Sequence, residues 1–212
     1  MEEIQVLPQK ENGVLVHDFL RSYLNYDRLE HAFCNAHLQR ELVFIHECYH
    51  EEWADKLKKL LSEMCGAREE RIAKGQTAFP KSELEGYLAR YDACVAEGIH
   101  LNTPKPIEGR KPRKPKGKRW SLLVRFRDYK DDILRFAYDW AVPFTNNEAE
   151  RSIRFTKIKQ KISGCFRTKQ GADDFYRIMS YVSSAKKHGA TCFDALLEAV
   201  NGRALQLVAS WA

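Results

Sequence analysis

Apolar positions recur at intervals of three and four residues over much of the chain, which is the pattern of helices with one buried face. From about residue 29 to residue 64 they form one continuous stripe, so this stretch is predicted to be helical. A second helix is predicted to begin at Ser82, to extend to about Ala96 and to end near Gly98. Further helical patterns cover residues 122–137, 172–187 and 192–208. The stripe consists of Leu42, Ile45, Tyr49, Trp53, Leu57, Leu60 and Met64.

One short segment has the character of a strand. Val14, Leu15 and Val16 are apolar or β-branched and lead directly into His17 and Asp18, so the segment predicts a strand that ends at a carboxylate. The nearest candidate partner is residues 4–7, and two short strands are rarely stable alone. Either the helices cover a very small sheet, or sheet-forming sequence lies upstream. The predicted fold is therefore mostly α-helical with a small β part.

The charge of the chain is unevenly distributed. The net charge is +6, but residues 101–170 hold 19 Lys and Arg against 7 Asp and Glu, and the remainder is net acidic. Residues 102–119 combine four prolines with many basic side chains, which predicts an extended basic arm. The asymmetry favours a polyanionic partner such as nucleic acid, although a solubilising basic surface is the alternative.

Other sequence features point to a cytoplasmic protein with no membrane partner. No apolar run approaches the roughly 20 residues that span a bilayer. The first residues are acidic and polar, unlike a signal peptide. The six cysteines are therefore expected to be reduced thiols.

Two local motifs suggest zinc. His46, Glu47 and His50 have the HExxH form, in which two histidines one helical turn apart bind the metal and the glutamate acts as a base. No third zinc ligand is evident downstream, and acidic residues follow directly. We therefore favour the interpretation that the two histidines flank the buried apolar stripe and bind no metal. Cys34 and His37 could form half of a structural zinc site, but no matching pair follows. Zinc is not expected.

A third constellation lies between Pro143 and Arg167. Asn146 or Asn147 could cap a helix whose first turn contains Glu148 and Glu150, and Lys and Arg side chains follow. Taken alone, this is a solvated helix end with an internal ion pair between Glu150 and Arg154, four residues apart.

Three strings together resemble a known family. They are VHDFLRSYLNYDRLEHAFCNAHLQREL, VPFTNNEAERSIRFTKIKQKISGCFRT and GADDFYRIMSYVSSAKKHG, and they resemble the insertion-sequence transposases of the sixty-six family in order from about residue 12 to residue 200. The resemblance implies a DDE-type catalytic domain with a ribonuclease-H-like α/β fold and a helical insertion. Such enzymes hold two divalent metals, Mg²⁺ or Mn²⁺, with three carboxylates and act on transposon ends and target DNA.

The resemblance also assigns residues. Asp18 matches the second catalytic acid and Glu150 the final one, with Glu148 the less favoured choice; both assigned acids would be metal ligands. Cys34, His37, Asn146 and Asn147 would support the site. The basic residues expected to contact DNA are Arg151, Arg154, Lys157, Lys159, Lys161, Arg167, Lys111, Arg113 and Lys114.

The match lacks the family's first catalytic aspartate, because residues 1–17 contain no Asp. We therefore expect a truncated, C-terminal part of a transposase, associated with the nucleoid and with little activity unless it self-associates or the missing N-terminal portion is supplied. Its expected organisation is a strand region with the second acid (1–28), a helical insertion (29–101), the basic arm (102–119) and a helical part with the final acid (120–212). A non-catalytic DNA-binding remnant and a zinc peptidase are the alternatives.

Overall fold

The computed structural model describes residues 13–103 and 117–204. The last helix, predicted to extend to residue 208, ends at Val200, within the described residues. Two expectations concern residues outside the described ranges: the strand at residues 4–7 and most of the basic arm. The arm's DNA-binding candidates Lys111, Arg113 and Lys114 lie there too. The chain divides into two compact units, Met1–Asn146 and Asn147–Ala212, and each is described by itself.

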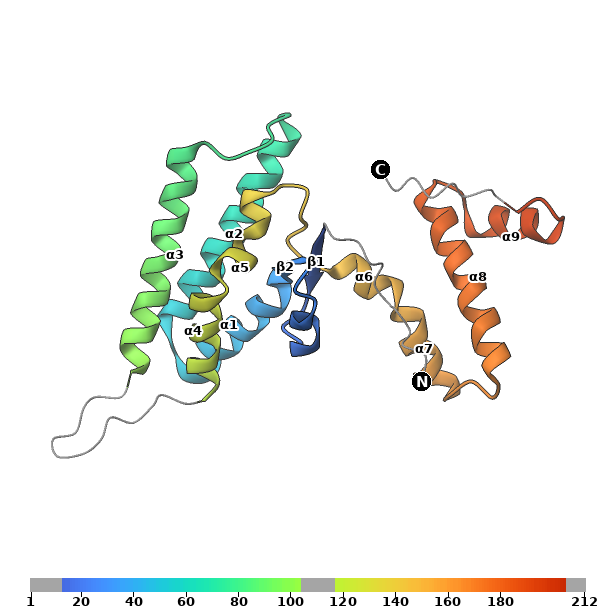
Figure 1. Ribbon diagram of the computed structural model, residues 1–212, viewed down its shortest axis with the longest axis horizontal. Coiled ribbons are helices and arrows are strands. Elements are labelled where there is room, and N and C mark those ends of the chain that lie inside the picture. The colour runs from blue at the N-terminus through green and yellow to red at the C-terminus, as the bar shows by residue number, and fades with distance from the viewer. Residues whose placement is uncertain (1–12, 104–116, 205–212) are drawn as a thin grey trace. The chain divides into compact units, whose positions relative to one another are not determined.

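A small parallel sheet belongs to the first unit (Figure 1). β1 (Val14–His17) is the predicted strand, and it pairs with β2 (Glu30–Phe33) in a register that places His17 opposite Phe33. The connection includes a short 3-10 helix, η1 (Arg21–Asn25). Parallel neighbours need a crossover of about a dozen residues, and this connection is just long enough.

The prediction of helix from residue 29 is wrong for β2. Its backbone bonds to β1, and the inner half of the strand, Ala32 and Phe33, is buried in the first unit. A four-residue strand that pairs with an earlier segment leaves almost no period-two signal, so the apolar spacing of the following helix dominates the local pattern. The predicted partner, residues 4–7, was therefore not needed to pair β1 within the described chain.

Helices form the rest of the described part of the first unit (Figure 1). They are α1 (Asn35–Tyr49), α2 (Glu52–Ala73), α3 (Lys81–Asn102), α4 (Lys118–Asp128) and α5 (Lys130–Tyr138). Helix α1 packs on α2, α2 on α3 and α3 on α4, while α5 contacts β2. Their shared core contains six of the seven stripe residues, namely Leu42, Ile45, Trp53, Leu57, Leu60 and Met64.

The seventh stripe residue, Tyr49, is exposed, which corrects the predicted stripe. Helix α1 ends at Tyr49, and His50 takes the left-handed backbone conformation with φ 56°. The chain therefore changes direction before α2 begins, and the helical phase of the stripe is interrupted. Tyr49 keeps 42% of its surface exposed while Trp53, four residues later, is fully buried.

Gly98 does not end α3, contrary to the prediction. A Cβ added at Gly98 would lie 2.5 Å from Leu123 Cδ2 and 2.9 Å from Trp53 Cδ2. The missing side chain lets α3 approach these two residues closely, and the helix continues to Asn102. The glycine serves helix packing rather than helix termination.

The second unit consists, where it is described, of α6 (Asn147–Ser152), α7 (Arg154–Ser163), α8 (Lys169–Lys187) and α9 (Cys192–Val200). Thr168 and Thr191 cap the last two helices by accepting hydrogen bonds from backbone N–H groups. Helices α8 and α9 pack through a small core of Val182, Ala185 and Ala195.

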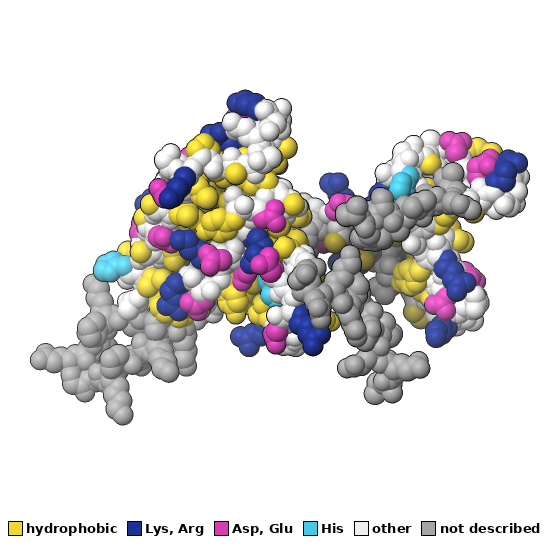
Figure 2. All heavy atoms as spheres, turned by 45° about the horizontal axis from the view of Figure 1, so that its top comes forward, with side chains coloured by type: hydrophobic (Ala, Val, Ile, Leu, Met, Phe, Trp, Pro, Cys, Tyr) yellow, Lys and Arg dark blue, Asp and Glu magenta, His cyan; other side chains and the backbone are white. Residues whose placement is uncertain are grey.

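Charged side chains of both signs lie side by side over the face of the first unit shown in Figure 2. Ion pairs join neighbouring helices of this unit: Lys56 with Glu97 at 2.9 Å, Arg90 with Glu63 at 2.7 Å and Lys130 with Asp92 at 2.7 Å. Within the described ranges, none of the helices has the length and apolar character to cross a membrane.

Candidate functional site

Asp18 lies directly after β1, as the sequence predicts, at the carboxyl ends of the two parallel strands. Its Oδ1 accepts a hydrogen bond from the backbone N–H of Leu20 at 3.2 Å. The backbone N–H of Cys34, the first residue after β2, donates to the carbonyl oxygen of His17 at 2.8 Å. Asp18 and Cys34 therefore both lie at the carboxyl ends of the parallel strands, which is where open sheets of this kind bind ligands.

Asp18 is preceded by His17, whose ring contacts a second histidine, His31. The ring of His17 is almost fully buried, its Nδ1 hydrogen bonds to the Asp18 carbonyl oxygen, and its Nε2 lies 2.9 Å from His31 Nδ1. Burial lowers the pKa of His17, and the neighbouring His31 lowers it further. Because a carbonyl only accepts, a neutral His17 has its proton on Nδ1 and accepts from Nδ1–H of His31. This relay fixes both tautomers.

Sequence analysis did not find the His17–His31 pair. Residues 14 positions apart become neighbours only because β1 and β2 pair in parallel. The arrangement is fixed further by Arg135 of α5, whose Nε donates to the His31 carbonyl oxygen at 2.7 Å and whose Nη1 lies 2.9 Å from Glu30 Oε2. No local pattern signals a contact of this kind.

The start of α1 binds the loop that follows α5. The backbone N–H of Asn35 donates to the Phe144 carbonyl oxygen at 3.1 Å, and the backbone N–H of Asn146 donates to Cys34 Sγ at 3.4 Å. Cys34 is buried at the N-terminal end of α1, and His37 lies half-buried in the first turn. Among the described residues, the amide oxygens of Asn35 and Asn146 are buried without a hydrogen-bond donor. These oxygens are suited to a ligand.

The predicted glutamates lie in the second unit. Glu148 and Glu150 both occupy the first turn of α6, which begins at Asn147. Lys187 Nζ lies 2.9 Å from Glu148 Oε1, and this hydrogen bond lowers the pKa of the Glu148 carboxyl. The carboxylate of Glu148 is therefore already used within its own unit.

The predicted DNA-contacting residues of the second unit lie on α6, α7 and the turn after α7. Lys157 and Lys161 are one helical turn apart on α7, and Arg154 lies three residues before Lys157, so the three share a face. All three are exposed and have no carboxylate partner in the described part of the chain. The ammonium of Lys159 lies over the ring of Phe166 at 5.7 Å. Arg151 and Arg167 are also exposed.

The HExxH segment lacks the geometry of a zinc peptidase. His46 and Glu47 belong to the last turn of α1, whereas His50 lies beyond its end in a left-handed conformation. The backbone N–H of His50 still donates to the His46 carbonyl oxygen at 2.9 Å, but the left-handed conformation of His50 takes its side chain out of the helical register that such a site requires. Glu51 has a packing role instead: it accepts a hydrogen bond from Trp53 Nε1 at 2.8 Å and pairs with Arg119 at 2.7 Å.

Comparison with known proteins agrees with the resemblance. The model of the Transposase IS66 family matches residues 1–174, a range that contains both strands, Asp18, Cys34 and the glutamates of α6. Neither the curated proteins nor the solved structures contain a significant match. Since the family match covers most of the sequence, the chain belongs to the IS66 family of transposases.

Proposed function

We propose that this chain performs metal-dependent phosphoryl transfer on DNA, with Asp18 and Glu150 as ligands of a divalent metal. The observation that supports this most directly is the position of Asp18. Its carboxylate follows a parallel strand, is oriented by the Leu20 N–H, and leaves the sheet beside Cys34. An acid at the end of a sheet strand is a rigid mount for a metal, because the strand is bonded on one side to its neighbour.

Covalent geometry allows Glu150 to reach the same edge. The backbone N–H of Asn146 donates a hydrogen bond to Cys34 Sγ, and the backbone N–H of Cys34 donates one to the carbonyl oxygen of His17 at the end of β1. Glu150 follows Asn146 by four residues. At about 1.5 Å per helical residue this is a rise of about 6 Å, and a fully extended chain of that length spans at most about 14 Å. Glu150 is proposed rather than Glu148 because the resemblance assigns the final acid to Glu150.

The residues present fit a hard divalent cation. Mg²⁺ and Mn²⁺ prefer oxygen ligands, and the buried amide oxygen of Asn146 has no donor among the described residues. Asn146 and Asn147 would support the metal site, while Cys34 and His37 would position the loop before α6 and the start of α1. When bound, such a metal would activate the attacking oxygen and stabilise the leaving oxygen of an in-line displacement.

DNA is the proposed partner, contacted by the basic face of α7. A ribonuclease-H-like arrangement is supported by a parallel strand pair with an acid at its end, although the described sheet has two strands. With two assigned carboxylates rather than three, we expect little strand transfer by this chain alone. Self-association or a further polypeptide would supply the remaining carboxylate ligand. Because the substrate is DNA, we expect the protein at the nucleoid.

Metal binding tests the proposal. Titration with Mn²⁺, followed by electron paramagnetic resonance, is expected to give a bound ion whose affinity falls at least about tenfold in Asp18→Asn and in Glu150→Gln. The matched control is Glu148→Gln, which removes the same charge two residues earlier in α6 and should leave the Mn²⁺ affinity unchanged. Equal affinity in all three variants would contradict the proposal.

The alternative is a DNA-binding protein without catalysis, and it is favoured by the exposed cations of α7. Its signature would be DNA binding that weakens with salt and is the same in Asp18→Asn and Glu150→Gln, in a chain that binds no Mn²⁺.

A further inference from the structure

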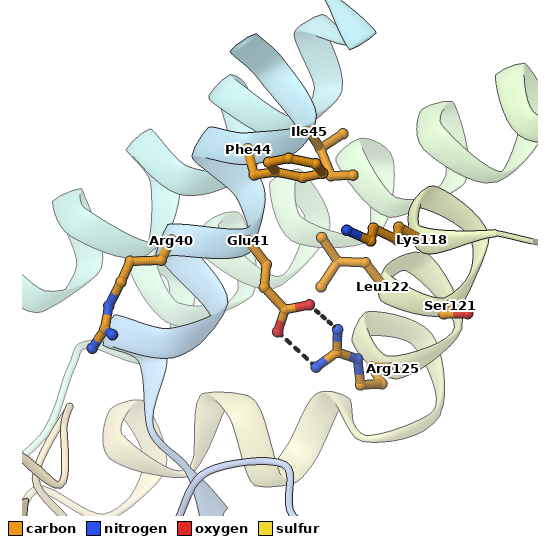
Figure 3. A pocket seen from close by; sticks show the side chains of 8 residues that line it. All are labelled: Arg40, Glu41, Phe44, Ile45, Lys118, Ser121, Leu122 and Arg125. Atoms are coloured by element: carbon orange, nitrogen blue, oxygen red, sulfur yellow. Dashed lines mark hydrogen bonds and ion pairs between the residues drawn. The ribbon is translucent and has the colours of Figure 1, made fainter. Parts of the chain in front are cut away.

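A cavity of about 440 Å³ lies between α1 and α4 in the first unit (Figure 3). Its volume falls in the range of ligand-binding pockets, about 300–1,000 Å³. Helix α1 contributes Arg40, Phe44 and Ile45 to the lining, and α4 contributes Lys118 and Leu122. Ile45 and Leu122 are buried and form an apolar floor. None of these residues belongs to the site around Asp18.

The cavity has unneutralised positive charge. Glu41 and Arg125 also line it, but they bind each other through two parallel hydrogen bonds, so their charges cancel (Figure 3). Arg40 and Lys118 have no carboxylate partner among the described residues, and Figure 3 shows Arg40 extending away from the Glu41–Arg125 pair. This differs from the rest of the first unit, where cations between helices are mostly paired.

An accessible aromatic ring stands beside these cations. Phe44 is 39% exposed, and the ammonium of Lys118 lies 4.7 Å from its ring centroid. Tyr49 is also exposed, and its ring packs edge to face with that of Phe44. The guanidinium of Arg119 lies 4.8 Å from the centroid of the Tyr49 ring. Aromatic rings interleaved with cations are the components with which proteins bind single-stranded nucleic acid, since bases stack on the rings and phosphates meet the cations.

We propose that this cavity, the α1–α4 groove, binds a single strand of DNA, with a base at Phe44 and phosphates at Arg40 and Lys118. The inference rests on the proposed action on DNA and adds the form of DNA that is bound. Charge along the sequence supports the same occupant, because the residues that lead into Lys118 include Lys111, Arg113, Lys114 and Lys116. A duplex keeps its bases stacked inside, so it cannot offer one to Phe44.

The test is fluorescence anisotropy with a labelled oligothymidine of about 15 nucleotides, a length at the upper end of single-strand site sizes. EDTA is present, so that the metal site plays no part. The Arg40→Ala/Lys118→Ala double variant is expected to lower the slope of log affinity against log salt by about 1.4, which is about 0.7 for each lost phosphate contact. Phe44→Leu is expected to weaken binding by about tenfold at constant salt, with the slope unchanged.

Lys81→Ala is the matched control, because Lys81 is also the first residue of its helix and is exposed but lies outside the cavity. It should change neither affinity nor slope. Glu41→Gln should tighten binding, since it frees Arg125 for a phosphate. Circular dichroism establishes that each variant is folded; if Phe44→Leu is not, the double variant and Glu41→Gln decide.

The proposal is overturned if the double variant behaves like Lys81→Ala, or if a duplex of the same length is bound as tightly and responds equally to Phe44→Leu. Because no metal is present, these outcomes are independent of Mn²⁺ binding. A chain that fails the Mn²⁺ test but shows the expected salt slopes would retain the groove and lose the proposed catalysis.

Discussion

Gly98 packs against the indole ring of Trp53 so closely that a Cβ at Gly98 would lie 2.9 Å from Trp53 Cδ2. Trp53 is fully buried at the start of α2, and Leu123 of α4 lies on the same glycine. Three helices therefore meet at one position that tolerates no side chain.

Gly98→Ala is expected to destabilise the protein. Overpacking a tight core costs about 1–3 kcal/mol, which exceeds the gain of about 1 kcal/mol from replacing a helical glycine by alanine. Gly86 lies in the same helix with no atom within 4 Å of its added Cβ, so Gly86→Ala should stabilise instead. Urea denaturation measures both, and a shift of the same sign in the two variants would show that the close contact is absent.

Tyr91→Phe is expected to lower the free energy of unfolding by about 1–2 kcal/mol, because it leaves a buried carbonyl without its donor. The Tyr91 hydroxyl donates to the Phe126 carbonyl oxygen at 2.8 Å, between α3 and α4. Tyr87→Phe, one turn earlier on α3, is the control and should cost much less. Thermal denaturation of the two variants side by side decides.

Arg135→Ala is expected to cost about 2–3 kcal/mol, since a charged, partly buried donor to the backbone of β2 is lost. Its Nε bonds the His31 carbonyl oxygen at 2.7 Å. Removing Arg90, whose pair with Glu63 is half-exposed, should cost at most about 1 kcal/mol. Hydrogen exchange of the β1 and β2 amides should accelerate only in Arg135→Ala; unaltered exchange would mean that this side chain does not secure the sheet.

Cys65 is expected to resist alkylation. Burial raises the pKa of its thiol to about 11, and the neighbouring Glu69 carboxylate acts in the same direction. At pH 8.5 it should react on the order of 100-fold more slowly than a thiol with the usual pKa of about 8.5, and its rate should still rise tenfold per pH unit. Mass spectrometry after iodoacetamide treatment compares it with the exposed Cys48 and Cys165. Equal labelling at pH 8.5 would contradict the shift.

Lys157→Ala and Lys161→Ala should each reduce the salt slope of duplex DNA binding by about 0.9, because each lysine is assigned one phosphate contact on the same face of α7. Lys81→Ala on α3 should leave the slope as it is. Fluorescence anisotropy with a duplex of arbitrary sequence is sufficient, since phosphate contacts carry no sequence information. Slopes equal to that of the control would remove α7 from the DNA interface.

Local patterns were sufficient for part of the fold. The strand before Asp18 and six of the seven stripe residues are confirmed, because a buried helix face or a β-branched run leaves its signal in neighbouring positions. Features that depend on distant contacts were wrong or missed. Glu30–Phe33 is a strand because β1 lies beside it, and Gly98 is a packing site because Trp53 approaches it.

The same division holds for the candidate site. Asp18 stands at the strand end where the sequence predicts it, while its role as a metal ligand stays a prediction, as does that of Glu150. The His17–His31 relay and the bond from Asn146 to Cys34 could not be predicted, since each joins residues that only the folded chain brings together.

The left-handed residue at the end of α1 also limits how this chain can vary in length. His50 joins two helices whose inner faces must both meet the core, and Trp53 follows it by three residues. His50 and Glu51 alone separate α1 from α2, so one residue inserted or deleted there would change how the chain enters α2 and would disturb the packing of Trp53 and Leu57 in the core. In related chains, insertions and deletions should therefore avoid the stretch from Tyr49 to Trp53.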